Sequence, residues 1–268
     1  MLCKILGNDN TKSMDNTKKT NKKFWLTLVL AVVIAALIGI AFVPTILEKR
    51  TKTEATSAES SVDAEAMRVL GCCNAYVAVN SFKTTMNGSV KAKVMGVPYT
   101  QKIHGGRAVD ASSGDFSDKA ESKSALVKAA IKRERRSGEY YVSRGEYKNK
   151  AFKYNSEKTL SKNGYISQYG QPFTGIVKYN LENAVISAKA VSKNVYKFVL
   201  DPARATVYSR NEVKTTLGGK SYPTYKTVEF TLTVDGDRPV KVSSTEKFRI
   251  NKFGGTDCTA KYTETFSF

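Results

Sequence analysis

One apolar run, from Phe24 to Val43, restricts this chain more than any other feature of its sequence. The run contains no charged side chain, and Thr27 is its only clearly polar one. A bilayer core about 30 Å thick requires about 20 apolar residues in a helix, and this run has that length. Inside a bilayer the backbone must satisfy its own hydrogen bonds, as a helix does. The run therefore predicts one transmembrane helix.

A cleaved secretory signal and a buried helix of a soluble protein are the alternatives for this run. Signal peptides have shorter apolar regions that end at small residues, whereas this run continues into Val43-Pro44-Thr45. No other part of the chain is apolar enough to surround a helix that is apolar on every side. An uncleaved signal-anchor is the interpretation that the run favours.

Positive charge is unequal on the two sides of the run. Six lysines precede Phe24, whereas Lys49, Arg50 and Lys52 follow it. The side richer in Lys and Arg stays in the cytoplasm, so the C-terminal part is expected outside, at the cell membrane. The segments expected are a cytoplasmic tail (1–23), a transmembrane helix (24–43), a flexible stalk (44–61) and one extracytoplasmic domain (62–268).

The part beyond the run is long and basic. Residues 48–268 hold 37 of the 43 basic and 22 of the 24 acidic residues, enough chain for one domain with a core. Such a charge attracts anionic surfaces, which outside a cell are lipid headgroups or cell-wall polymers rather than nucleic acid. The partners expected are the membrane bilayer, a lipid or lipoprotein ligand and an anionic cell-wall polymer. A solvated basic surface without a partner is the alternative.

The spacing of apolar residues changes near residue 80. From Val62 to Val79 they recur every three or four residues, which predicts a helix. From Phe82 to Val94 they alternate with polar residues, which predicts a long strand with one buried face. Alternation returns at Val228–Val234, and Asp235–Pro239 has the composition of a turn. Residues 228–268 are therefore expected to form a three-stranded antiparallel meander.

The middle of the chain is expected to mix strands with two short helices. The helices are predicted at Ser156–Tyr169 and from Asp201 to Leu217, the second with Asp as N-cap and Pro as first residue. A strand is expected from Tyr99 to Gly106, and others at 116–122, 126–136, 139–144, 185–190 and 195–200. Together these elements predict an α+β protein with a mainly antiparallel β domain.

Residues that carry catalysis or bind metals are scarce. His104 is the single histidine, which argues against a metal site and against a Ser/His/Asp relay. Gly219-Lys220-Ser221 lacks the first glycine of a phosphate-binding loop, and Asp235 with Asp237 lacks the rest of a calcium loop. The basic run Lys132–Arg136 is interpreted as a solvated strand end. No metal, cofactor or catalytic residue is predicted, and the chain is expected not to be an enzyme.

The order of elements points to a family. A helix ends in Asn80-Ser81-Phe82 and leads directly into a long strand, and a strand–Asp-Gly-Asp-Arg-Pro–strand turn lies at Val234–Val240. Over about residues 62–268 this order resembles the LolA/LppX-like superfamily of lipoprotein and lipid carriers, here as a membrane-anchored member of Gram-positive type. The resemblance implies a curved half-barrel with packed helices around a hydrophobic cavity. It also implies a membrane-anchored protein that holds a hydrophobic or lipid-like ligand.

A scaffold is the alternative function. In this alternative the chain is a non-enzymatic subunit for assembly of the cell envelope, such as the single-pass NTF2-like components of conjugation machines. Those domains open with more than one helix, whereas here one helix precedes a long strand, which favours the carrier.

A ligand cavity is expected over the inward face of the first strand. Gly88 and Ala92 lie on that face among larger residues and would leave room in the middle of a curved sheet. Packing of this face against the first helix is the alternative. The residues expected to border the cavity are Phe82, Met86, Val90, Ala92, Phe230 and Leu232.

Three cysteines lie beyond the apolar run, where a disulfide could persist outside a cell. Cys73 is on the apolar face of the first helix, and Cys258 begins the last strand. These two form the candidate disulfide, although spacing alone does not decide the pairing and leaves Cys72 open. A free buried cysteine is the alternative.

Overall fold

The structure, a computed structural model, describes residues 61–268 apart from 95–96, 124–127, 173, 208, 211–222 and 251–254. The expected cytoplasmic tail, the transmembrane helix at 24–43 and nearly all of the stalk lie outside these residues. Within the part that is described, no helix has the length and the apolar character needed to cross a membrane.

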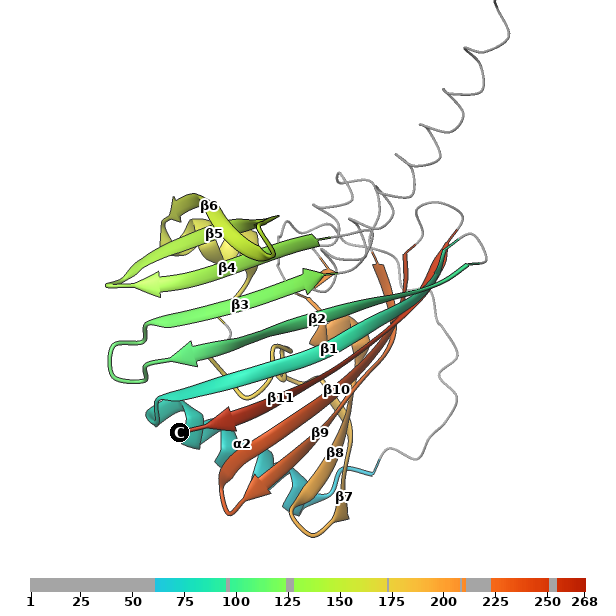
Figure 1. Cartoon of the computed structure of the whole chain (residues 1–268). Helices are drawn as coiled ribbons and strands as arrows, with labels where there is room; N and C mark the ends of the chain where they lie inside the picture. The colour runs from blue at the N-terminus through green and yellow to red at the C-terminus, as the bar shows by residue number, and fades with distance from the viewer. Residues whose placement is uncertain are drawn as a thin grey trace, which may run out of the picture.

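Eleven strands form one antiparallel sheet in the order β6-β5-β4-β3-β2-β1-β11-β10-β9-β8-β7 (Figure 1). Two meanders of consecutive strands make up this sheet, and they join where the first strand pairs with the last. The strands are β1 (Phe82–Val94), β2 (Val97–Val109), β3 (Phe116–Lys123), β4 (Lys128–Arg136), β5 (Glu139–Lys148), β6 (Ala151–Leu160), β7 (Val185–Ser192), β8 (Val195–Leu200), β9 (Pro223–Asp235), β10 (Arg238–Ile250) and β11 (Thr256–Ser267).

This architecture differs from the expected one. The sequence predicts an α+β fold in which a transmembrane helix is followed by a curved half-barrel with packed helices. The described chain is mainly β, and its sheet stays open, with β6 and β7 as edges. The expected helix at Ser156–Tyr169 is wrong in its first part, because β6 continues to Leu160 and α3 spans only Lys162–Tyr169. The expected helix from Asp201 to Leu217 begins as α4 (Pro202–Ala205), with Asp201 as its N-cap. Turns follow at 206–207, residues 209–210 are again helical, and 211–217 lie outside the described residues.

Helix α2 (Ala64–Val79) covers one face of the sheet and contacts β7 and β10. The Asp63 side chain accepts a hydrogen bond from the Glu65 amide and caps the first turn, as short polar side chains do at a helix start. The buried side chains recur at three- and four-residue spacing, so the predicted apolar face is confirmed except at Val62, which is 51% exposed. They are Ala66, Val69, Leu70, Cys73 and Val77.

Strand β2 runs through His104-Gly105-Gly106, where the sequence predicts a strand end. A Cβ on Gly105 would collide with the carbonyl oxygen of Lys119, and one on Gly106 with that of Thr84. The two glycines therefore allow the neighbouring strands to approach β2 closely, a common use of glycine inside a sheet.

Gly106→Ala is expected to lower the free energy of unfolding by roughly 1–3 kcal/mol, because its Cβ would meet rigid backbone. Gly71→Ala is the matched control: a Cβ there meets nothing within 4 Å, and Gly71 lies in the interior of α2. This variant should raise stability by roughly 0.5–1 kcal/mol through helix propensity. Urea unfolding of the full-length variants measures both values, and equal effects would contradict the close approach at Gly106.

Candidate functional site

Two neighbouring cavities, of about 610 and about 570 Å³, open at the end of the sheet where β2 turns into β3. Both are lined by Val109, Asp110 and Arg135, so they flank one shared wall. We call the two together the end cleft. Their volumes fall within the range of about 300–1,000 Å³ that is usual for small-molecule sites.

The cavity of about 570 Å³ lies between the C-terminal end of α2, helix α3 and the sheet. Apolar side chains line it from all three elements, and amide and charged groups lie among them. The apolar lining includes Val77, Ala78, Val109, Tyr140, Ile166 and Pro172, and the polar lining includes Asn74, Lys162, Thr174 and Gln171.

The cavity of about 610 Å³ lies at the ends of β1, β2, β3, β4 and β11. Phe82 and Phe116 contribute to it but are almost fully buried, whereas the C-terminal Phe268 is 44% exposed. Lys83 and Arg136 add positive charge to this cavity, and Glu134 adds negative charge. Its chemistry is therefore apolar at the base and mixed in charge at the rim.

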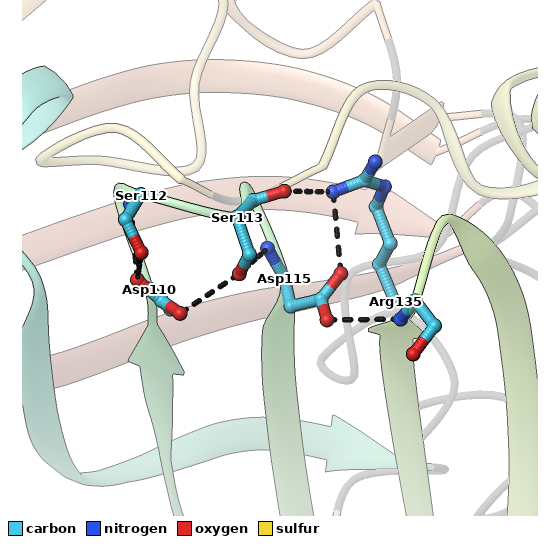
Figure 2. Close-up of polar contacts among 6 residues, drawn as sticks. Asp110, Ser112, Ser113, Asp115 and Arg135 are labelled. Carbon is cyan, nitrogen blue, oxygen red and sulfur yellow. Dashed lines mark hydrogen bonds and ion pairs between the residues drawn. The ribbon is translucent and has the colours of Figure 1, made fainter.

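The shared wall is braced by hydrogen bonds between two hairpin turns (Figure 2). The Asp110 carboxylate accepts bonds from the Ser112 amide (2.9 Å) and from the hydroxyls of Ser112 (2.7 Å) and Ser113 (2.8 Å). Arg135 donates to the Ser113 carbonyl oxygen (2.7 Å) and pairs with Asp115 (3.2 Å). These bonds hold the turn after β2 against the end of β4.

Hydrogen bonds from Ser112 and Ser113 hold the pKa of Asp110 well below its usual range. The folded state therefore keeps this carboxylate charged, and its contribution to stability is present above the pKa of an unfolded Asp, about 3.9. That contribution is lost only as the pH falls further, through the lower pKa of the folded state.

A buried ion pair lies on the same face of the sheet, beyond the cleft. Arg107 is 7% exposed and pairs with Glu264 across β1 (2.6 Å). Its Nη1 also donates to the Gly175 carbonyl oxygen (2.7 Å), and Gly175 lines the smaller cavity. The guanidinium lies over the Phe82 and Phe266 rings, 5.5 and 5.7 Å from their centroids. Arg107 thus connects the sheet to a wall of the end cleft.

A second buried ion pair joins Arg133 on β4 to Asp118 on β3. The interpretation of Lys132–Arg136 as a solvated strand end is therefore wrong for Arg133, which is 2% exposed. The alternation of residues in β3 does indicate that Asp118 is buried, because it shares a face with the buried Phe116 and Ala120. The sequence does not show which arginine would face it.

A third polar group is buried under β10 and β11. The Glu246 Oε1 atom accepts hydrogen bonds from the hydroxyls of Tyr179 (2.8 Å) and Tyr262, and Lys178 lies 3.3 Å away. Burial, followed by the charge of Glu246, raises the pKa of both tyrosines well above the usual value, so both stay neutral. The cluster ties the segment after α3 to the middle of the sheet, and sequence reasoning missed it.

The six residues expected to border a cavity do not gather around one in the described structure. Val90, Ala92, Phe230 and Leu232 are buried in the core, and Met86 packs against that core. Phe230 stacks on Phe198, with ring centroids 4.8 Å apart. Phe82 alone of the six lines a described cavity.

Gly88 lies beside a bulky residue of the neighbouring strand. A Cβ at this position would lie 2.7 Å from the Cβ of Tyr262 on β11, its neighbour across the strands. The glycine therefore accommodates the close approach of Tyr262.

Cys72, Cys73 and Cys258 are free thiols, so the candidate disulfide between Cys73 and Cys258 is not formed in this structure. Burial raises the pKa of both Cys73 and Cys258 to about 12. Such thiols stay protonated and unreactive near neutral pH.

Comparison with known proteins finds no matching family model and no matching curated relative. Similar solved structures include the ywiB protein from Bacillus subtilis, at 9% identity and a TM-score of 0.25, covering 68% of this chain and 91% of that one. LolA superfamily protein NE2245 from Nitrosomonas europaea has 10% identity and a TM-score of 0.26, covering 74% and 90%. A DUF1329 family protein from Desulfovibrio piger has 8% identity and a TM-score of 0.31, covering 75% and 91%.

These neighbours thus include a member of the LolA superfamily, the family that the sequence resembles. TM-scores this low do not establish a common fold, so membership of that superfamily stays a prediction.

Arg107→Met should lower the free energy of unfolding by roughly 3–5 kcal/mol, because it leaves the largely buried Glu264 carboxylate unpaired. The matched control is Arg238→Met, which removes an exposed pair with Asp235 and should cost less than about 1 kcal/mol. Urea unfolding of the full-length variants compares the two. The double variant Arg107→Met with Glu264→Leu should recover much of the loss, and no recovery would contradict the assigned cause.

Iodoacetamide at pH 8 should modify the half-buried Cys72 in the folded protein and leave Cys73 and Cys258 unmodified. In urea all three should react, because unfolding returns the pKa of a cysteine thiol to about 8.5. Peptide mass spectrometry identifies the modified residues. A disulfide-linked peptide containing Cys73 and Cys258 would contradict the free thiols.

Proposed function

We propose that this chain is a binding protein rather than an enzyme, and that it holds a hydrophobic or amphipathic, lipid-like ligand in the end cleft. The observation that supports this most is the cavity of about 570 Å³ between α2, α3 and the sheet. Apolar walls from three separate elements with a few polar groups are the usual composition of a small-molecule site.

The arrangement of polar groups suggests how such a ligand would lie. Its apolar body would pack against Val77, Tyr140 and Ile166, which line the cavity from α2, β5 and α3. Its polar end would meet Asn74 and Gln171, which can donate and accept hydrogen bonds. A ligand with one apolar and one polar end uses both parts of this lining.

The proposed position differs from the one that the sequence predicts. The middle of the sheet is occupied by Tyr179, Tyr262 and Phe230, so the ligand is placed at the end of the sheet. An extracytoplasmic position at the cell membrane remains part of the proposal. It is supported by the lysines that precede residue 24 and by the supply of lipid there.

Labelling with a photoactivatable long-chain fatty acid tests the proposal on the full-length protein. Crosslinks should concentrate in peptides that contain residues 74–78, 109–111 and 162–172. Ala78→Trp places an indole in the cavity from the exposed surface of α2, and labelling of these peptides should fall at least about fivefold because the volume is filled.

Ala75→Trp is the matched control, since Ala75 is also exposed on α2 but lines none of the described cavities. It should label as strongly as the wild type. Labelling spread evenly over the protein, or lost equally in both variants, would remove the carrier function and leave the envelope scaffold as the better explanation.

A further inference from the structure

The face of the sheet opposite α2 carries a regular pattern of lysines and hydroxyl groups on its four central strands. Ser89 of β1 lies between Lys102 of β2 and Lys261 of β11 in the strand register. Two residues along β1, Lys91 lies between Thr100 and Thr259. The pattern extends to β10, where Thr245 pairs with Lys261 and Lys247 pairs with Thr259. The resulting rows are Lys102–Ser89–Lys261–Thr245 and Thr100–Lys91–Thr259–Lys247.

Lysine and hydroxyl residues alternate along both rows, and the second row is displaced by one strand relative to the first. Neighbouring strands are about 4.8 Å apart and alternate residues about 6.7 Å apart, so successive lysines lie roughly 8 Å from one another. All four lysines are exposed. They form a zigzag track across the sheet, which we call the lysine track (Lys102, Lys91, Lys261 and Lys247).

In the described register, no acidic residue lies on this face of β1, β2, β10 and β11 from the row across the strands that contains His104 to the row that contains Lys91. The nearest carboxylates at its margins already have partners. Glu229 on β9 pairs with Lys197 (2.8 Å), and Asp257 pairs with Lys226 (2.7 Å). The charge of the track is therefore not neutralised by the surrounding described side chains, and it attracts anions.

The composition of the face restricts which polyanion fits. Single-stranded nucleic acid is bound by aromatic side chains on which the bases stack, and these rows hold none. Proteins that lie on a bilayer insert Trp, Phe or Leu among their basic residues, and these are absent from the rows as well. Lysines with intervening hydroxyl groups offer only charge and hydrogen bonds, which suit phosphate groups on a flexible polyol chain.

We propose that the lysine track binds a flexible polymer of polyol units joined by phosphodiesters. Each lysine meets one phosphate, and the serine and threonine hydroxyls between them donate to phosphate oxygens or accept from the polyol. This surface lies on the face opposite α2 and is separate from the end cleft, so the protein could hold a small ligand and a polymer together.

Binding of poly(glycerol phosphate) to the full-length protein tests the proposal. A variant with Lys91, Lys102, Lys247 and Lys261 all changed to Gln should bind at least about tenfold more weakly at physiological salt. The slope of log affinity against log salt should fall by about three, since each lost phosphate contact on a single chain contributes about 0.7. Unchanged urea midpoints would show that the exposed substitutions keep the fold.

The matched control changes Lys153, Lys158, Lys189 and Lys193 to Gln, which are exposed lysines on the outer strands β6 and β7 and in the turn after β7. It alters net charge equally and should keep wild-type affinity. An equal loss of affinity in this control would show that the polymer binds through the net charge of the protein, and it would overturn the lysine track as the binding site. Displacement of the polymer by single-stranded DNA, or by phosphatidylglycerol vesicles, at equal phosphate concentration would overturn the assigned partner.

The lysine variant should keep fatty-acid labelling in the end cleft, and Ala78→Trp should keep polymer binding. The two proposals therefore fail independently of each other.

Discussion

The two meanders of this sheet meet only where β1 pairs with β11, and Arg107 secures that junction from the buried side. It reaches across β1 to Glu264 on β11, is covered by two phenylalanine rings and donates to the carbonyl oxygen of Gly175. Removing a guanidinium from water is costly, so the arrangement persists only because these partners are all in place. The segment that carries Gly175 is thereby placed beside α3 and the sheet, where it forms one wall of the end cleft.

Strand alternation gives the two faces of the sheet separate chemical roles. On the side of α2, most alternate residues of the strands are apolar and form the core, and buried polar groups lie among them. On the other side, the intervening residues of the central strands are mostly polar, with lysine, serine and threonine the most frequent, and many of them are exposed. A ligand that needs an apolar environment is thus restricted to the end of the sheet, where hairpin turns and helix ends do not pack completely.

Two strands have the bounds that the sequence predicts. The bounds of β1 (Phe82–Val94) and β8 (Val195–Leu200) are confirmed. In β1 apolar and polar residues alternate, and such a half-buried strand is recognisable from its own residues. The predicted cavity depended on contacts between distant segments, such as that of Gly88 with Tyr262, which the sequence alone does not show. The pairing of Arg133 with Asp118 likewise depends on the register of β3 against β4, which neither strand reveals alone.

The chain enters the domain at its far edge. Ser61 and Asp63 flank Ala188 of β7 in a short parallel bridge, with hydrogen bonds of 2.9 Å from the Asp63 amide to the Ala188 carbonyl oxygen and 3.2 Å from the Ala188 amide to that of Ser61. A mechanical pull on the preceding chain would load these two hydrogen bonds before α2, because they come first along the chain. The helix and the core beneath it would bear the force only after these two hydrogen bonds had broken.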